Sequence, residues 1–272
     1  MKLARYLRDG DVGFGRVHDD TIVDLQGKAP TMEAFVEAGP VVWERARTSG
    51  GAILPLREIT LVAPLRPASL RDFLAFEDHA QGGAARRNEQ LNPAWYKMPV
   101  YYKGNHRQIV GPDEPVPWPN WTERLDFELE LACVLGPDQT IFGYTVMNDW
   151  SARDVQRAEM AMRLGPAKSK DFATSLGPWI VTADEFDPNA GLAMRASVDG
   201  EVWFETGDAR MHWTFEQMIA YIADGETVYP CDVYGSGTPF GGCGLDQGRW
   251  IPRSATVELE VDGIGILRNA VT

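Results

Sequence analysis

Acidic and apolar side chains alternate without a break in residues 125–131, whose sequence is Leu-Asp-Phe-Glu-Leu-Glu-Leu. If this segment is a β-strand, Asp126, Glu128 and Glu130 point to one face and the apolar side chains to the other. Carboxylates two positions apart on a strand lie roughly 7 Å from each other and repel. An apolar run continues to Leu135, which suggests that the strand enters the interior. A bound cation would relieve the repulsion between these carboxylates.

A Glu-x-Glu pair alone is weak support for a metal site, because the same spacing returns at Glu258 and Glu260. That second pair lies just before an Asp262-Gly263 turn and is typical of the polar outer face of a β-hairpin. Two other polar segments strengthen the case for the first pair. Residues 143–154 form a dense polar cluster, and residues 72–79 include one of only four histidines.

The types of ligand in these segments predict a hard cation. Carboxylate oxygens favour Mg²⁺, Mn²⁺ or Ca²⁺ over zinc. The three cysteines, Cys133, Cys231 and Cys243, form no C-x-x-C pair, and the chain contains no H-E-x-x-H segment. An odd number of separated cysteines also argues against a disulfide framework and agrees with a reducing compartment.

Five separated segments together resemble the successive signatures of the fumarylacetoacetate hydrolase family, in the family's order and at its spacing. They are residues 72–79, 125–136, 148–156, 168–179 and 235–238. The resemblance is clear over roughly residues 60–272, while the first sixty residues match only the looser pattern of the family's small N-terminal domain. It implies an α+β, β-rich fold, with a mixed β-roll in residues 63–272 after a small N-terminal α+β domain in residues 1–62.

The resemblance also implies a metal site and a catalytic dyad. The metal ligands are expected at Asp72, Glu128, Glu130 and Asp149. Mg²⁺ is the expected ion, with Mn²⁺ or Ca²⁺ as alternatives. The family's general-base histidine falls at His79, seven residues after the first aspartate.

The carboxylate that orients His79 is expected at Asp246, where part of the family has a glutamate. Aspartate is one methylene shorter, so the loop that carries it must shift to keep a hydrogen bond to the histidine. Other members place a glutamate three residues after the histidine, where this chain has Gly82. Asp72, taken alone, would also suit the N-cap of a helix that continues past His79.

The remaining site residues rest on the same resemblance. The family has one lysine near the metal ligands, and Lys168 and Lys170 both stand in the matching segment; counting back from Pro178-Trp179 favours Lys170. The Gly-Ser-Gly-Thr segment at residues 235–238 fits neither a G-x-S-x-G elbow nor a phosphate loop, so we expect it to line the pocket. Substrate contacts are expected from Arg86 (or its neighbour Arg87), Tyr102 and Thr238.

The function that the resemblance implies is metal-dependent hydrolysis of a carbon–carbon bond in a β-diketone or acylpyruvate, a small diketo or oxo acid. In this hypothesis His79, oriented by Asp246, activates water, and Lys170 helps to stabilise the leaving enolate. Decarboxylation, hydration or isomerisation of a 2-oxo acid would need the same enolate but no hydrolytic water. A non-catalytic small-molecule binder is a third hypothesis. Leu74, where some family members carry an aromatic hydroxyl, argues against fumarylacetoacetase itself.

Composition limits the class of partner. The chain has 272 residues and is 44% hydrophobic, enough to bury a large core. Its net charge of −13 argues against nucleic acid, because phosphate binding needs a basic face. It has no apolar stretch near the ~20 residues of a membrane span and no signal-peptide core at its start. We therefore expect a cytoplasmic protein and, from the resemblance, a homodimer.

Short strands must position these residues, because Gly and Pro turns separate most apolar segments. Strands are predicted at residues 3–7, 12–17 and 21–25, and a domain boundary at the Pro-bearing residues 63–67. Helical spacing is found at residues 32–48, interrupted at Gly39-Pro40, and at residues 70–87, 152–163 and 214–223.

Overall fold

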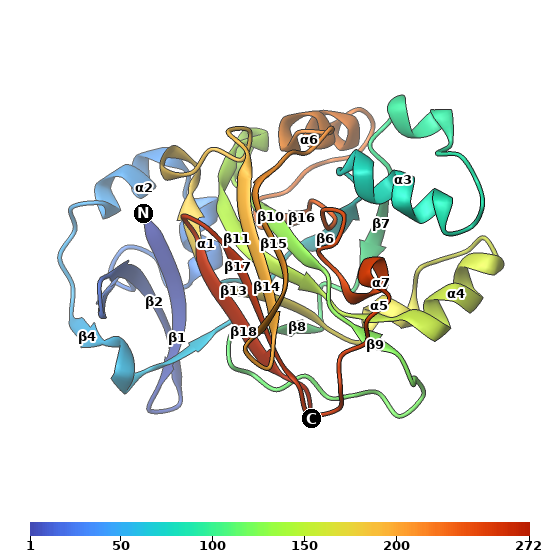
Figure 1. Ribbon diagram of the computed structural model, residues 1–272. Helices are drawn as coiled ribbons and strands as arrows, with labels where there is room; N and C mark the ends of the chain where they lie inside the picture. The colour runs from blue at the N-terminus through green and yellow to red at the C-terminus, as the bar shows by residue number, and fades with distance from the viewer.

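A mixed sheet of twelve strands is the largest element of the computed structural model, which describes residues 1–272 (Figure 1). Its strands are β1 (Lys2–Arg8), β2 (Asp11–His18), β3 (Thr21–Asp24), β4 (Ile53–Pro55), β5 (Thr60–Val62), β6 (Ser69–Phe73), β7 (Tyr101–Gly104), β8 (Ile109–Val110), β10 (Leu129–Leu135), β11 (Ile141–Asp149), β13 (Thr174–Thr182) and β16 (Asp232–Gly235). Hydrogen-bonded neighbours follow the order β4-β3-β2-β1-β13-β11-β10-β16-β6-β7, while β5 also pairs with β1 and β8 with β13. The N-terminal strands therefore continue the sheet of the larger part, and a domain boundary at residue 63 stays a prediction.

A second, antiparallel sheet of four strands packs against the first. In order it contains β15 (Glu201–Ala209), β14 (Leu192–Val198), β17 (Thr256–Val261) and β18 (Gly265–Ala270). A cluster of 33 buried residues fills the core here, including Leu131 and Cys133 of β10 and Leu259 of β17. As predicted, β17 and β18 form a hairpin around the Asp262-Gly263 turn, and Glu258 and Glu260 alternate with buried apolar residues.

Strand β10 is buried on both faces, which is why its sequence becomes continuously apolar. Leu131 and Cys133 belong to the core between the sheets, whereas Ala132 and Val134 belong to a second core of 19 buried residues. Phe35 of helix α1 (Met32–Glu37) packs in this second core. A strand so enclosed can hold a polar side chain only where that side chain finds partners.

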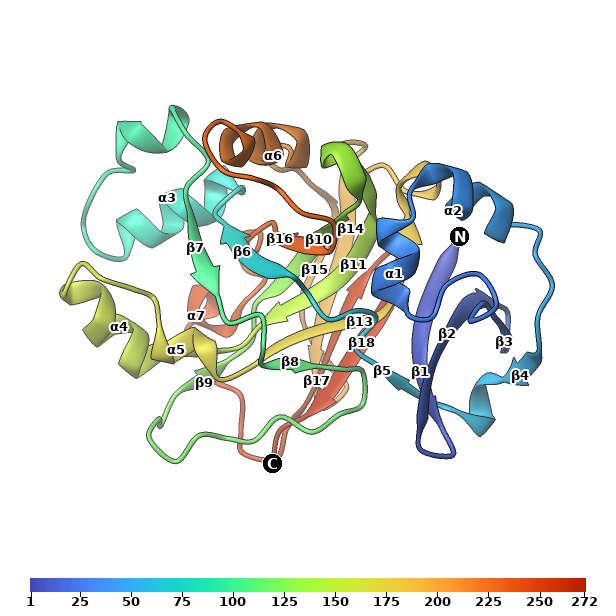
Figure 2. The same cartoon turned by 180° about the vertical axis from the view of Figure 1, so that it is seen from behind.

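Six further helices cover the sheets. They are α2 (Pro40–Ala46), α3 (Glu77–Ala85), α4 (Arg153–Ala161), α6 (Phe215–Ala223) and the short pair α5 (Lys168–Asp171) and α7 (Gly244–Gln247). Figures 1 and 2 show α3, α4, α5 and α7 gathered at the side of the molecule away from the N-terminal strands. The candidate site residues of the helices thus all lie at one side of the sheet.

The β-rich α+β fold class is confirmed, as are the three N-terminal strands and the helices near residues 152–163 and 214–223. The predicted break at Gly39-Pro40 is also correct, because Gly39 caps α2 with φ +79° and Pro40 begins that helix. None of the helices has the length and apolar character required to cross a membrane. The cytoplasmic location and the homodimer stay predictions.

Two predicted elements are wrong. The helix over residues 70–87 is a strand, β6, followed by a helix that begins only at Glu77. Parallel pairing with β16 and antiparallel pairing with β7 bury β6, and this pairing outweighs the local helical spacing. Asp72 is consequently a strand residue and not a helix cap. The strand over residues 125–131 is also interrupted, since β9 (Leu125–Asp126) pairs with β12 (Ser151–Ala152) and β10 begins at Leu129.

Candidate active site

Four buried carboxylates converge beside the sheet, and they are the four predicted metal ligands. Asp72 lies on β6, Glu128 precedes β10, Glu130 lies on β10 and Asp149 ends β11. One carboxylate oxygen of each lies within 4.8 Å of those of the other three. The strand order β11-β10-β16-β6 causes this convergence, because it sets β6 one strand away from β10.

Backbone of the Gly235–Thr238 segment forms one wall of this carboxylate cluster. A Cβ atom on Gly235 would lie 2.7 Å from Asp72 Oδ1 and 2.8 Å from Glu130 Oε2, so only glycine leaves room for both carboxylates. The N–H of Gly237 donates to the same two oxygens, at 3.2 Å and 3.0 Å. The segment therefore contributes backbone and space to the site, as the sequence suggests.

Cationic side chains are unevenly distributed around the four carboxylates of the cluster. Burial, together with repulsion from Asp149, raises the pKa of Asp72 well above its usual value, and burial and Asp72 do the same to Glu130. Burial opposes ionisation of Glu128 as well, but Arg153 and Lys170 outweigh it and lower the pKa of that carboxyl. The negative charge on the Asp72 and Glu130 side thus has no cationic side chain bound to it.

Two oxygen atoms of the cluster, Glu130 Oε1 and Asp149 Oδ1, are buried and accept no hydrogen bond. Buried acceptors of this kind normally have a partner. An all-carboxylate set with unpartnered oxygens fits a hard divalent cation with oxygen coordination. Asp72, Glu128, Glu130 and Asp149 therefore suit the predicted ion.

Of the two candidate lysines, the structure places Lys170 in the cluster. Its buried Nζ lies 2.6 Å from Glu128 Oε2 and also donates to Asp149. Lys168 is exposed, with Nζ 5.0 Å from the centroid of the Trp121 ring. The reason is helical geometry, since residues two apart on α5 point to different sides.

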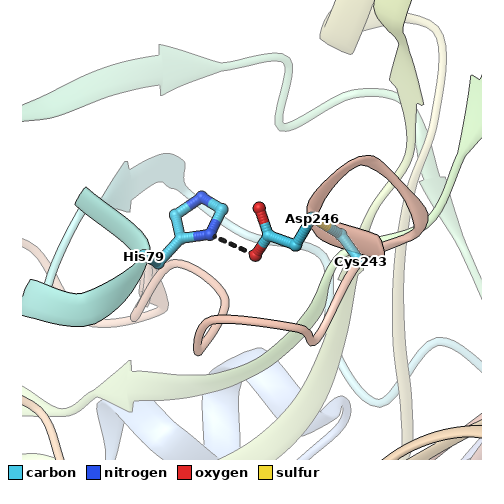
Figure 3. Close-up of side chains that lie close together, drawn as sticks. All are labelled: His79, Cys243 and Asp246. Carbon is cyan, nitrogen blue, oxygen red and sulfur yellow. Dashed lines mark hydrogen bonds and ion pairs between the residues drawn. The ribbon is translucent and has the colours of Figure 1, made fainter. Parts of the chain in front are cut away.

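The histidine and its expected partner also meet. His79 Nδ1 of α3 lies 2.8 Å from Asp246 Oδ2 of α7, and Figure 3 shows the second ring nitrogen directed away from the carboxylate. Asp246 Oδ2 accepts a further hydrogen bond from the N–H of Gly241 at 2.8 Å. Burial would raise the pKa of Asp246, but the hydrogen bond and charge of His79 outweigh burial and lower it. The shorter aspartate side chain therefore reaches the histidine.

Phe240 explains why a partner three residues after His79 is absent. A Cβ atom on Gly82 would lie 2.5 Å from the Phe240 ring, so the ring occupies the space that a side chain at position 82 would need. The loop that carries Phe240 leads into α7 and Asp246. The loop thus occupies the space that a partner of His79 at position 82 would need, and it leads to the partner that is present, Asp246.

The three predicted substrate contacts differ in position. The ring centroid of Tyr102, on β7, lies 5.8 Å from Lys170 Nζ, at the carboxylate cluster. Arg86 Nη1 lies 2.5 Å from Asp246 Oδ1, so its guanidinium holds the dyad carboxylate. Thr238 is buried, with its hydroxyl 3.5 Å from the carbonyl of the next residue. Arg87, the alternative to Arg86, is exposed and pairs with Glu89.

Arg153 and Asp126 form a bridge that sequence reasoning missed. Arg153 Nη2 lies 2.8 Å from Glu128 Oε1 and 2.8 Å from Asp126 Oδ2. Asp126 accepts from the N–H groups of Gly244 and Leu245, the first turn of α7, at 2.9 Å and 3.0 Å. This Arg153–Asp126 bridge ties a cluster carboxylate to the helix that carries Asp246. Its only signal in the sequence is that both residues stand inside the polar motifs.

Replacing Arg153 by Gln should destabilise the fold by about 3–5 kcal/mol, because it leaves buried Asp126 without its cation and Glu128 with Lys170 alone. Urea unfolding at pH 7 measures the change. Arg268→Gln is the matched control, since Arg268 pairs with Asp113 at the surface, and it should lose at most about 1 kcal/mol. Equal losses in the two variants would contradict a structural role for the bridge.

Replacing Asp246 by Asn should lower the melting temperature at pH 7, and the difference from the wild type should shrink on acidification. The folded pKa of Asp246 lies below its ordinary value of about 3.9, so its ionised form stabilises the fold above that pH. This stabilisation disappears as the pH falls through the lower folded value. Melting curves between pH 7 and pH 3 test this, with exposed Asp138→Asn as control; a difference independent of pH would contradict it.

Comparison with known proteins agrees with this geometry. Residues 69–272 match the family model described as fumarylacetoacetate (FAA) hydrolase, C-terminal, and residues 1–64 match one described as Rv2993c-like, N-terminal. The chain is 30% identical over 288 residues to the mitochondrial oxaloacetate tautomerase FAHD2A of Homo sapiens, covering 98% of this chain and 89% of that protein. It is 28% identical over 289 residues to fumarylacetoacetase of Arabidopsis thaliana, covering 77% of this chain and 68% of the plant enzyme.

Two solved structures share the whole architecture. Fumarylacetoacetate hydrolase from Exiguobacterium antarcticum superposes with a TM-score of 0.81 at 25% identity, over 100% of this chain and 99% of that one. The 2-hydroxyhepta-2,4-diene-1,7-dioate isomerase from Mycobacterium marinum gives a TM-score of 0.75 at 26% identity, over 100% and 98%. The relatives therefore include hydrolases, isomerases and a tautomerase on one fold. On these matches, the chain belongs to the fumarylacetoacetate hydrolase family.

Proposed function

We propose that this protein is a divalent-cation-dependent enzyme that hydrolyses a carbon–carbon bond in a β-diketo acid such as an acylpyruvate. The observation that carries the proposal is the His79–Asp246 dyad next to the carboxylate cluster. Glu128 forms an antiparallel β-bridge with Cys243, which lies three residues before Asp246. A base and a set of cation ligands thus share one site.

Asp72, Glu128, Glu130 and Asp149 would hold the cation, and Mg²⁺ is the ion that we propose for this all-oxygen set. When bound, the ion would polarise a substrate carbonyl and stabilise negative charge on an enolate oxygen. The chain's own cations contribute beside it. Burial opposes the charge on Lys170, but Asp149 and Glu128 outweigh burial and raise its pKa, so Lys170 stays protonated and can donate to a substrate oxygen.

The dyad supplies the proton transfers. Because Asp246 accepts from the Nδ1–H of His79, the Nε2 atom is left as a hydrogen-bond acceptor. His79 Nε2 takes a proton from water, and the hydroxide adds to the substrate carbonyl carbon. The carbon–carbon bond then breaks, its electron pair remains on the leaving carbon as an enolate, and His79 returns the proton there. One water is consumed, and a carboxylic acid and a methyl ketone are formed.

A tautomerase is the second candidate, and a specific observation favours it. The human protein that aligns with nearly the whole chain is named an oxaloacetate tautomerase. The same residues could perform that reaction without water, since His79 Nε2 could remove a proton from the carbon beside a ketone and return it to the enolate oxygen. The two candidates differ in whether water reaches His79.

Turnover of acetylpyruvate and oxaloacetate with Mg²⁺, with Mn²⁺ and after EDTA separates these candidates. Hydrolysis yields acetate and pyruvate, identified by mass, whereas tautomerisation changes the enol absorbance of oxaloacetate without any change in mass. His79→Ala should lower kcat by about 10²- to 10⁴-fold. His18→Ala, which removes an exposed histidine on β2, is the control and should keep the wild-type rate. Full activity in His79→Ala would exclude the dyad from the chemistry.

Glu130→Gln should abolish stabilisation by a divalent cation without unfolding the protein. The wild type should gain about 5 °C in melting temperature with Mn²⁺ at a hundredfold excess over its Kd. In EDTA the variant should melt at or above the wild type, because it removes one of four repelling charges. Glu258→Gln makes the same change in the β17–β18 hairpin and should keep the Mn²⁺ effect. A Mn²⁺ shift that survives in Glu130→Gln would place the ion elsewhere.

A further inference from the structure

A cavity of about 620 Å³, here called the seam pocket, lies where the N-terminal strands meet the larger part of the molecule. It is bounded by β1, by the start of β2, by the segment that follows β5 and by the segment that leads into β8. Its volume is in the range of small-molecule sites. No member of the carboxylate cluster or of the dyad lines it, so it is separate from the site described above.

The polar lining of this seam pocket is mostly basic. Arg5, Arg66, His106 and Arg107 line it, against a single acidic residue, Glu114. Such a concentration is notable in a chain with 39 acidic and 26 basic residues. Of the three arginines, only Arg5 has a carboxylate within 4 Å, at 3.8 Å from Glu33. Arg66 and Arg107 thus face the pocket without an ionic partner in the chain.

Arg5 is the buried member of the group. Its residue is 8% exposed, and its guanidinium makes one hydrogen bond, from Nη1 to the carbonyl of Ala63 at 3.0 Å. Burial lowers the pKa of Arg5, and nearby Arg66 lowers it further against the opposing charge of Glu33. A charged group held this deep is costly unless it is paired. Glu33, at 3.8 Å, is the one carboxylate that pairs with Arg5, and an anion in the seam pocket would add a second.

The loop that carries His106 and Arg107 is held in place before any ligand binds. The Asn105 side chain donates to the carbonyl of Asp171 at 3.0 Å and accepts from the N–H of Arg107 at 3.1 Å. Strand β8 then pairs in parallel with β13. A preformed site loses less entropy on binding than a mobile one.

We propose that the seam pocket binds a small organic acid that carries two or more carboxylates. Arginine guanidinium groups bind carboxylates through paired hydrogen bonds, and Arg66 and Arg107 stand at the surface where a second acidic group can reach them. Half of the lining residues are hydrophobic, among them Val62 and Leu65, and they suit a carbon skeleton. An inorganic anion would leave this apolar half without contacts.

Calorimetric titration with citrate tests the proposal, on protein that a chelating resin has freed of metal, in a buffer without other carboxylates and at constant ionic strength set with NaCl. Citrate should bind saturably, and Arg66→Gln and Arg107→Gln should each weaken it at least tenfold. Both residues are exposed, so both variants should fold. Arg45→Gln removes the same charge from an exposed position on α2 and should bind as the wild type does.

Four results would overturn the assignment. Equal weakening in Arg107→Gln and Arg45→Gln would show a general charge effect, and unchanged binding in Arg66→Gln and Arg107→Gln would place citrate elsewhere. Binding of inorganic phosphate without binding of citrate would exclude the organic-acid class. Failure to bind citrate or succinate at millimolar concentration would exclude the site itself. The titration needs no turnover, so its outcome does not depend on the proposed enzyme activity.

Discussion

The repulsion between four carboxylates in a space where water is scarce is the constraint on which the site depends. Each of them is at most 7% exposed, and their partners are one lysine, one arginine, one backbone N–H and, for Asp149, the Tyr102 hydroxyl. Those donors are unevenly distributed. Lys170 and Arg153 serve Glu128 and Asp149, whereas Asp72 and Glu130 share the N–H of Gly237. The side of Asp72 and Glu130 is therefore where the missing positive charge belongs.

The same buried charges connect the two halves of the site. Glu128 contacts Arg153, Arg153 contacts Asp126, and Asp126 binds the first turn of α7, whose next residue is Asp246. Glu128 and the dyad are thus joined by a continuous series of mostly buried ion pairs and hydrogen bonds. Arg86 fixes Asp246 from the opposite side. These contacts fix the position of the His79–Asp246 dyad relative to the carboxylate cluster, although their residues come from distant parts of the chain.

The sequence named most of the residues that the structure brings together in the candidate site, because their types and spacing can be recognised without coordinates. Alternation placed Glu128 and Glu130 together, and the family resemblance supplied Asp72, Asp149, His79 and Asp246. It failed where pairing between distant segments decides the outcome. The apolar residues after residue 70 do have helical spacing, but residues 69–73 form a strand because they pair with β16 and β7. Asp126 shares the alternation of its neighbours, yet the break after β9 turns it to Arg153 and α7.

The position of the dyad bears directly on the chemistry. His79 and Asp246 come from separate helices, and the loop before α7 fixes both the Asp246 carboxylate, through the N–H of Gly241, and the Phe240 ring against Gly82. Phe240 remains 46% exposed, so this loop forms part of the boundary between the dyad and solvent. Hydrolysis requires a water molecule at His79 Nε2, whereas tautomerisation consumes none. The same loop therefore orients the proposed base and borders solvent, and access of water to that base is the point on which the two proposed reactions differ.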